Sequence, residues 1–208
     1  MKKLTGLLCL IFYLPLQAAD SEVAAKGEIL FNQNCVFCHQ KDAIGKPGLA
    51  PSLSNPELLE ITTDKYLMAT IRDGRSDTSM PPYSHLGREN IKAIVAFLRS
   101  HETRPNRADE VNAQITAQGD SRLGKVWFEQ ICATCHGTEG DGYLAGGSGT
   151  AIGKAGFLSK ASDGFIRETI KVGRSNTRML PFQGPEGLAD LSNREIEDII
   201  SYMRTLAP

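Results

Sequence analysis

The 208-residue sequence predicts an all-α protein built from two tandem copies of one unit. Three observations support this prediction. Apolar residues recur at helical spacing near the end of each half, no sustained alternation of apolar and polar residues indicates strands, and stretches of the first half return in order in the second. With 41% hydrophobic and 23% charged residues, the composition is typical of a globular protein.

Residues 1–19 are expected to be a cleaved secretory signal. Lys2 and Lys3 precede an apolar run from Leu4 to Leu16, and the small residues Ala18 and Ala19 follow it. The run is too short to span a bilayer, so we expect cleavage after Ala18 or Ala19 and a soluble periplasmic chain. Losing both lysines leaves 21 basic against 24 acidic residues, a formal charge of −3, which does not favour nucleic-acid binding.

The internal repeat defines the expected domains. Three stretches of the first half recur in the second half with matching residues in register. They are Gly27–Cys35 with Gly124–Cys132, Asp64–Ser76 with Asp163–Ser175, and Gly87–Ser100 with Ser192–Thr205. We therefore predict a first domain over residues 20–104, a polar linker over 105–118 and a second domain over 119–208.

An amphipathic helix is expected at the end of each half. Aliphatic residues recur three, four and seven positions apart there, which places them on one helix face. These residues are Ile91, Ile94, Val95 and Leu98 in the first half and Ile196, Ile199, Ile200 and Met203 in the second. Ser192 and Glu195 have the spacing of a capping box, so the second of these helices should start just after Ser192.

Every cysteine outside the predicted signal lies in one of two C-x-x-C-H motifs. The motif residues are Cys35, Cys38 and His39 in the first half and Cys132, Cys135 and His136 in the second. This pattern is typical of c-type haem attachment. On a helix, positions i, i+3 and i+4 share a face, so two thiols can bond the haem vinyl groups while the next imidazole reaches the iron. The sequence therefore predicts two covalently bound haem c groups.

Three other uses of paired cysteines fit the sequence less well. Two C-x-x-C pairs could form a four-cysteine zinc site, but zinc does not require a histidine after each pair. Redox dithiols of the thioredoxin type would need a strand-helix-strand setting, for which we find no signal. Structural disulfides in an exported protein would not explain two complete haem motifs without a stray cysteine.

A repeated loop supplies the expected sixth ligands of the two irons, Met80 and Met179. GRSDTSMPPY, residues 74–83, returns as GRSNTRMLPF, residues 173–182, with six of ten positions identical. The methionines lie 41 and 43 residues after His39 and His136, and prolines behind them exclude helix, so each segment can present its sulfur. A His/Met pair is the ligand set of electron-transfer cytochromes c.

The rival ligands are not repeated. Met68 aligns with Arg167, His85 has no histidine counterpart, and Met203 lies on the apolar stripe of the last helix. A histidine ligand or an open iron in one half stays the alternative.

These motifs resemble tandem class I cytochrome c domains, most similar in layout to the periplasmic dihaem cytochromes of the cytochrome c4 family. The resemblance covers nearly the whole predicted mature chain. It implies that the first helix of each half crosses the last one, with Gly27 and Phe31 near Phe97 and with Gly124 and Phe128 near Tyr202. It also implies that the carbonyl of Pro51 orients the His39 imidazole, whereas Thr150 or Ala151 stands in the second half.

The sequence also indicates roles or positions for several other residues. Arg75 and Arg174 precede the methionine loops and either bind haem propionates or are solvated loop charges. Trp127 is expected to pack in the core or at the haem edge, and Tyr83 and Phe182 to wall the pockets. His85 and His101 are expected at the surface.

The sequence thus predicts an electron carrier without catalytic residues, since no Ser/His/Asp set or acid pair stands out. It would pass single electrons from a quinol-oxidising or dehydrogenase donor complex to a terminal oxidase or reductase. One alternative is a cytochrome subunit of a dehydrogenase complex, as in flavocytochrome sulfide dehydrogenases. Another is a dihaem enzyme, such as a peroxidase or thiosulfate dehydrogenase, which would need an exchangeable iron site.

Overall fold

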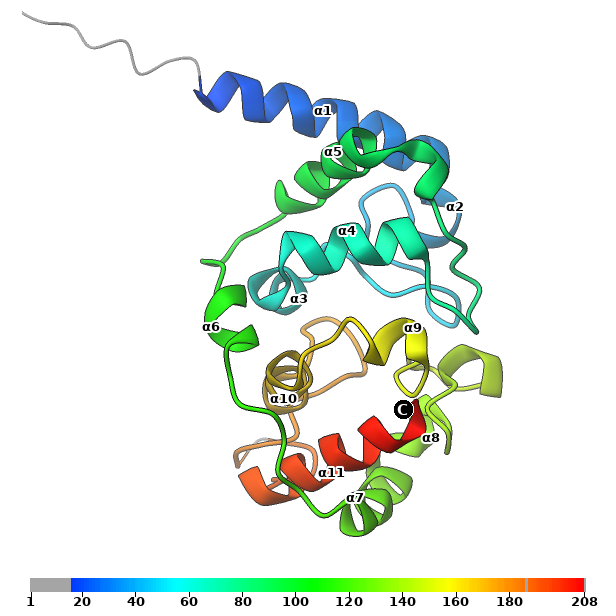
Figure 1. The fold of residues 1–208 in the computed structure, drawn as a ribbon, viewed down its shortest axis with the longest axis vertical. Helices are drawn as coiled ribbons and strands as arrows, with labels where there is room; N and C mark the ends of the chain where they lie inside the picture. Colours follow the sequence, from blue (N-terminus) through cyan, green and yellow to red (C-terminus); the bar gives the residue numbers. More distant parts are fainter. Residues whose placement is uncertain (1–15, 186, 208) are drawn as a thin grey trace, which may run out of the picture.

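The computed structural model describes residues 16–185 and 187–207, which form two helical halves stacked along the long axis (Figure 1). Of the predicted signal, residues 1–15 lie outside the described part, and α1 begins at Leu16. In the described part the only strand-like pairing is an isolated bridge between Lys46 and Ala50, so the predicted all-α class is confirmed. Within that part no helix is both long enough and apolar enough to cross a membrane.

The two halves have corresponding α-helices in the same order and differ in the short 3-10 and π-helical turns between them. The first contains α1 (Leu16–Asn34), α2 (Val36–His39), α3 (Pro56–Ile61), α4 (Asp64–Asp73), the 3-10 turn η1 (Ser84–Leu86) and α5 (Arg88–Arg99). α6 (Ala108–Asn112) follows between the halves. The second contains α7 (Ser121–Trp127), the π-helical turn η2 (Phe128–Cys132), α8 (Ala133–His136), the 3-10 turn η3 (Gly142–Ala145), α9 (Ala155–Leu158), α10 (Asp163–Val172) and α11 (Asn193–Leu206).

The first and last helices of each half cross at a glycine, as predicted. A Cβ on Gly27 would collide with the Ala93 carbonyl of α5, and one on Gly124 would collide with the Asp198 carbonyl of α11. The aromatic pairs sit beside these crossings: ring centroids are 5.1 Å apart for Phe31 and Phe97, and 5.4 Å apart for Phe128 and Tyr202. The absent side chain therefore lets the two helix backbones approach closely.

The predicted helix ends and core residues agree with the structure. The Ser192 side chain accepts from the Glu195 amide, and Glu195 in turn accepts from the Ser192 amide at 2.7 Å, which completes the capping box. The apolar stripes of α5 and α11 are buried, Leu98 and Met203 included. Trp127 is partly buried against the core of the second half, so its expected packing is confirmed, and Met68 is partly buried against the core of the first half.

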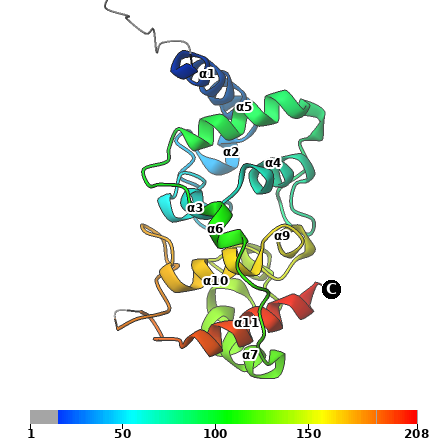
Figure 2. The same ribbon diagram turned by 60° about the vertical axis from the view of Figure 1, so that its left-hand side comes forward.

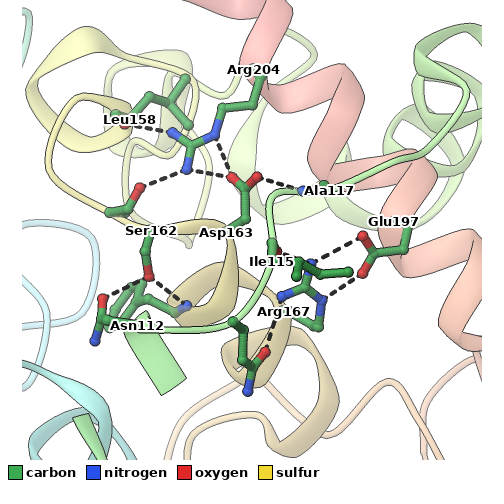
Figure 3. A network of polar contacts seen from close by, with 12 residues as sticks. Asn112, Ile115, Ala117, Leu158, Ser162, Asp163, Arg167, Glu197 and Arg204 are labelled. Carbon is green, nitrogen blue, oxygen red and sulfur yellow. Dashed lines mark hydrogen bonds and ion pairs between the residues drawn. The ribbon is translucent and has the colours of Figure 1, made fainter. Parts of the chain in front are cut away.

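An arginine on each last helix ties it to the start of the preceding long helix. Arg204 bonds the Asp163 carboxylate at 2.6 Å and donates to the carbonyls of Leu158 and Ala161 (Figure 3). Arg99 does the same in the first half, with Asp64 at 2.8 Å and with the carbonyls of Leu59 and Thr62. This repeated contact was not predicted from the sequence, although each half has an arginine and an aspartate at the equivalent positions.

The segment predicted to be a linker contains α6, which packs between the halves (Figures 1 and 2). Ala108 and Val111 of α6 are buried, and Gly164 of α10 lies directly against the Val111 carbonyl. Arg107 links the halves through Glu60 of α3 at 2.7 Å and Glu168 of α10 at 2.9 Å. The connection between the halves is thus a packed and hydrogen-bonded element.

Candidate haem sites and the interface between them

The two C-x-x-C-H motifs form short helical segments, one in each half. Cys35 caps α2, which ends at His39, while in the second half the π-helical turn η2 ends at Cys132 and α8 ends at His136. All four thiols are free and half-buried. Each segment therefore presents two thiols and one imidazole together, as covalent haem attachment requires.

The alternatives for the cysteines do not match this geometry. Burial raises the pKa of the Cys35 thiol to about 11 and that of Cys132 to about 12, whereas reactive redox dithiols need a lowered pKa. Within residues 16–185 and 187–207 no three His, Cys, Asp or Glu side chains gather to hold a metal ion. The two cysteine pairs lie in separate halves and do not form a joint zinc site.

A backbone carbonyl holds each motif histidine. His39 Nδ1 lies 3.0 Å from the Pro51 carbonyl, and His136 Nδ1 lies 2.8 Å from the Thr150 carbonyl. A carbonyl oxygen accepts a hydrogen bond only from a protonated Nδ1. In a neutral imidazole with this tautomer, Nε2 has no proton, and its lone pair is free to bind a metal. Of the two residues considered in the second half, Thr150 and not Ala151 thus provides the carbonyl. Burial lowers the pKa of both imidazoles, which keeps them in the neutral form that a metal ligand needs.

The two methionine loops share one hydrogen-bond pattern. In the first loop the Arg75 amide donates to the Met80 carbonyl at 3.0 Å, and the Thr78 hydroxyl bridges the Arg75 carbonyl and the Met80 amide. In the second loop Arg174, Thr177 and Met179 form the same three bonds at 2.6, 2.8 and 3.0 Å. Both methionines are half-buried.

The loop sequence follows from this closure. Gly74 and Gly173 have φ values of 66° and 65°, and a Cβ on either would meet the carbonyl of the following methionine at 2.5–2.6 Å. Asp77 and Asn176 also adopt positive φ, a conformation that these residue types tolerate better than most. The repeated threonine, which the sequence analysis did not interpret, closes the loop. The glycine, the arginine backbone, the threonine and the methionine backbone of the repeat thus all take part in closing the loop.

The halves meet through equivalent positions of the repeat. Tyr66 of α4 stacks on Phe165 of α10, with ring centroids 5.3 Å apart and planes 28° apart. The Arg75 guanidinium lies over the Phe157 ring at 5.2 Å and donates to the Tyr66 hydroxyl at 2.7 Å. Arg174 lies over the Phe165 ring at 5.6 Å. Both arginines therefore lie at the interface between the halves.

Arg174 is the less satisfied of the two. One amino group of its guanidinium donates to Thr169 at 3.0 Å, while Nη1 is buried and has no partner among the described residues. Burial away from water lowers its pKa to about 10, which still leaves it charged at neutral pH. A buried cation with an unused donor calls for an anionic acceptor, and the propionates of a haem supply one. This orphaned donor, the paired thiols and the fixed imidazole fit haem c as the group held here.

The structure also shows where the other residues singled out in the sequence lie. Tyr83 packs against the first core and donates its hydroxyl to the Asn34 carbonyl at 3.0 Å, and Phe182 is buried. His85 is exposed, as expected. The surface prediction for His101 is wrong, because this residue is half-buried, its ring packs edge-on against Phe97 at 5.0 Å, and its Nε2 is buried.

Comparison with known proteins assigns a family model to each half. Residues 22–98 match the model described as "Cytochrome C oxidase, cbb3-type, subunit III", and residues 121–207 match the model "Cytochrome c". Together the matched segments cover both C-x-x-C-H motifs and both methionine loops. The first match ends one residue before the end of α5.

Curated relatives align with both halves. The cbb3-type cytochrome c oxidase subunit CcoP of Rubrivivax gelatinosus is 30% identical over 191 residues, which cover 91% of this chain and 57% of that protein. The FixP subunit of Bradyrhizobium diazoefficiens is 28% identical over 161 residues, which cover 73% of this chain and 52% of that protein. The chain thus spans little more than half the length of these relatives.

A solved structure shares the fold. A chain of the Kuenenia stuttgartiensis reducing HAO-like protein complex Kustc0457/Kustc0458 superposes with a TM-score of 0.53 and 20% identity, covering 88% of this chain and 96% of that one. At this identity the likeness concerns the fold alone.

Proposed function

From two tandem class I cytochrome c domains with two covalent haem c groups, we propose a periplasmic electron-transfer protein that passes single electrons between redox proteins. The donor would be a quinol-oxidising or dehydrogenase complex, and the acceptor a terminal oxidase or reductase. When bound, haem c supplies the one-electron chemistry of its iron. The polypeptide attaches it, chooses its ligands and sets its surroundings.

The proposed ligands are His39 and Met80 in the first domain and His136 and Met179 in the second. Cys35 and Cys38, and Cys132 and Cys135, would form the thioether bonds. The observation that carries the proposal is the duplicated methionine loop, which is closed by the same three hydrogen bonds in both halves. Such a loop holds the methionine backbone in place, so that the thioether is presented with little loss of freedom on ligation.

This ligand set favours electron transfer over catalysis. A histidine and a methionine on each iron would leave no coordination position for a substrate, whereas a peroxidase or a similar enzyme needs one. Thioether ligation also stabilises the ferrous state, which suits a carrier that delivers electrons to an oxidase.

A second candidate is a permanent subunit of an oxidase complex. The relatives CcoP and FixP are named as subunits of cbb3-type oxidases, and the first half matches the model of such a subunit. These relatives favour an oxidase as the acceptor, and a dehydrogenase complex is the other assembly we consider. The cytochrome c4-like layout stays our proposal for a free carrier. Purification of the native protein distinguishes these cases: a free carrier elutes alone, and a subunit elutes with its complex.

Redox titration tests the ligand assignment. We expect Met80→Ala to lower the potential of one haem and Met179→Ala to lower that of the other, because loss of the thioether disfavours ferrous iron. Met68→Ala is the matched control, since this methionine packs in the first core. If Met68→Ala lowers a potential and Met80→Ala does not, the first haem is ligated from α4 and the proposal is wrong.

A further inference from the structure

Two residues at the start of α3 in the first domain reach across the interface to the second methionine loop. The Asn55 side-chain amide donates to the Ser175 carbonyl at 3.0 Å. Glu57 Oε2 accepts from the Ser175 amide at 3.1 Å and from the Ser175 hydroxyl at 2.9 Å. Three hydrogen bonds therefore hold both polar backbone groups and the side chain of one loop residue.

Ser175 occupies the base of the loop that presents Met179. It follows Arg174, whose amide closes the loop on the Met179 carbonyl and whose carbonyl accepts from Thr177. A displacement of Ser175 thus moves its neighbour Arg174, whose amide and carbonyl each form one of the bonds that close the loop. The position of the Met179 backbone is coupled through these bonds to Asn55 and Glu57.

Asn55 and Glu57 are themselves held firmly. Both are buried, at 5% exposure each, and Asn55 also caps α3 by accepting from the Leu58 amide at 3.1 Å. The second oxygen of Glu57 pairs with Arg104 at 2.9 Å. Burial pushes the pKa of Glu57 up, but hydrogen bonds from its own amide and from Ser175, with the Arg104 charge, bring it below its ordinary value. The acceptor is therefore an ionised carboxylate at neutral pH.

The reciprocal contact carries no such side chain. Gly156 holds the repeat position of Glu57, and the ideal Cβ position at this glycine lies 2.6 Å from the Ser76 amide nitrogen and 2.8 Å from the Arg75 Cα. At this repeat position the second domain thus offers the first loop no polar side chain, although the Phe157 ring lies against the Arg75 guanidinium. The two ligand loops are alike internally but differ in what the partner domain provides.

We propose that Glu57 and Asn55 are positioning residues of the first domain that hold the Met179 loop of the second domain in its ligating geometry. The second haem would then depend on the docked first domain for the strength of its methionine ligation, while the first haem would not depend on the second domain in this way. The inference rests on the proposed assignment of Met179 as a ligand.

Competition by imidazole tests the proposal on the full-length ferric protein with both haems attached. Imidazole displaces a methionine ligand, and the long-wavelength absorption band of the methionine–ferric bond disappears as it binds. Loss of the carboxylate leaves the Ser175 amide and hydroxyl without their acceptor, so Glu57→Ala should raise the affinity for imidazole about tenfold at one haem only. Glu57→Gln keeps an acceptor oxygen and should restore most of the parent behaviour.

Glu168→Ala is the matched control for this effect. Glu168 also bridges the domains, through Arg107 at 2.9 Å, but among the described residues no hydrogen bond or ion pair joins its side chain to the methionine loop. A role of Glu57 in docking alone predicts that both variants lower the stability and leave imidazole binding unchanged. That result, or an equal change at both haems, overturns the proposal.

Two further variants keep the test decisive. Ser175→Ala removes one of the bonds to Glu57 at an exposed residue, and Ser76→Ala is its counterpart in the first loop. If Glu57→Ala fails to fold, a higher imidazole affinity in Ser175→Ala but not in Ser76→Ala supports the proposal, and no difference between them refutes it. Met179→Ala identifies the second haem in every titration. If Met179→Ala keeps both methionine bands, the ligand assignment fails, and this outcome is distinct from an unresponsive Glu57.

Discussion

Replacement of Arg204 by alanine should destabilise the protein more than the same change at Arg99. The two arginines hold equivalent places, and each binds two carbonyls and one aspartate; Figure 3 shows the contacts of Arg204. Arg99 also pairs with Glu102, three residues further along the chain, at 2.7 Å. The two aspartate carboxylates differ in exposure, because the Asp163 side chain is 7% exposed and that of Asp64 is 67% exposed. The repeat thus supplies a buried and a solvated version of one contact.

The expected magnitudes follow from this difference. Removing one partner of a buried ion pair costs about 3–5 kcal/mol, since it leaves a charge without compensation. Asp163 keeps one hydrogen bond, from the Ala117 amide at 2.7 Å, so we expect Arg204→Ala to cost about 3 kcal/mol. Asp64 can be solvated by water when its arginine is removed. We therefore expect Arg99→Ala to cost about 1–2 kcal/mol, most of it from the lost hydrogen bonds to the two carbonyls.

Guanidinium chloride unfolding of the holoprotein, followed by far-ultraviolet circular dichroism, measures both changes. Arg204→Lys is a useful third variant, because lysine keeps the charge but cannot bind the aspartate and both carbonyls together. It should lie between the parent and Arg204→Ala. Equal costs for Arg99→Ala and Arg204→Ala, or a cost below about 1 kcal/mol for Arg204→Ala, would refute the argument from burial.

Three more predictions use single positions. Gly124→Ala should destabilise by about 1–3 kcal/mol in thermal unfolding, although alanine favours helices, because its Cβ would collide with α11; a more stable variant contradicts this. Arg174→Gln should lower the potential of the second haem, since removal of a buried positive charge favours ferric iron, whereas the exposed Arg178→Gln should leave it unchanged. The Arg122 side chain lowers the pKa of Asp120 to about 2, so this carboxylate stabilises the fold above pH 4 and loses that effect as the pH falls towards 2. The stability difference between the parent and Asp120→Asn should accordingly shrink in acid, and a constant difference from pH 6 to pH 2.5 would contradict the assignment.

The fold and the cofactor could be predicted because both depend on local patterns that occur twice. Helical spacing, the capping box at Ser192 and the C-x-x-C-H motifs each lie within a few residues, and the repeat distinguishes a recurring feature from chance. Alignment of the halves could also have revealed the arginine–aspartate pairs, since Arg99 and Arg204 both stand near the end of the last helix. Their role was missed because an exposed arginine is the ordinary expectation.

The interface could not be predicted in the same way. The contact between Glu57 and Ser175 joins residues 118 positions apart, and nothing in their own neighbourhoods indicates a partner. His101 illustrates the same limit, because its burial follows from the position of Phe97 on the preceding turn and from the chain around it rather than from its polarity. Local pattern predicts helices and haem motifs, whereas contacts between domains need the three-dimensional arrangement.

Divergence of the repeat at one hydroxyl group accounts for much of the asymmetry at the interface. Tyr66 and Phe165 hold equivalent positions and stack on one another, but only the tyrosine has an acceptor for its arginine. Arg75 therefore bonds Tyr66, and the hydroxyl of Thr70, the counterpart of Thr169, is buried without a partner among the described residues. Lacking a phenol, the second half directs Arg174 to Thr169 instead and leaves its other amino group buried and unused. Two duplicated loops with the same internal bonds thus experience different electrostatic surroundings, so two chemically identical haems in this chain need not have the same potential.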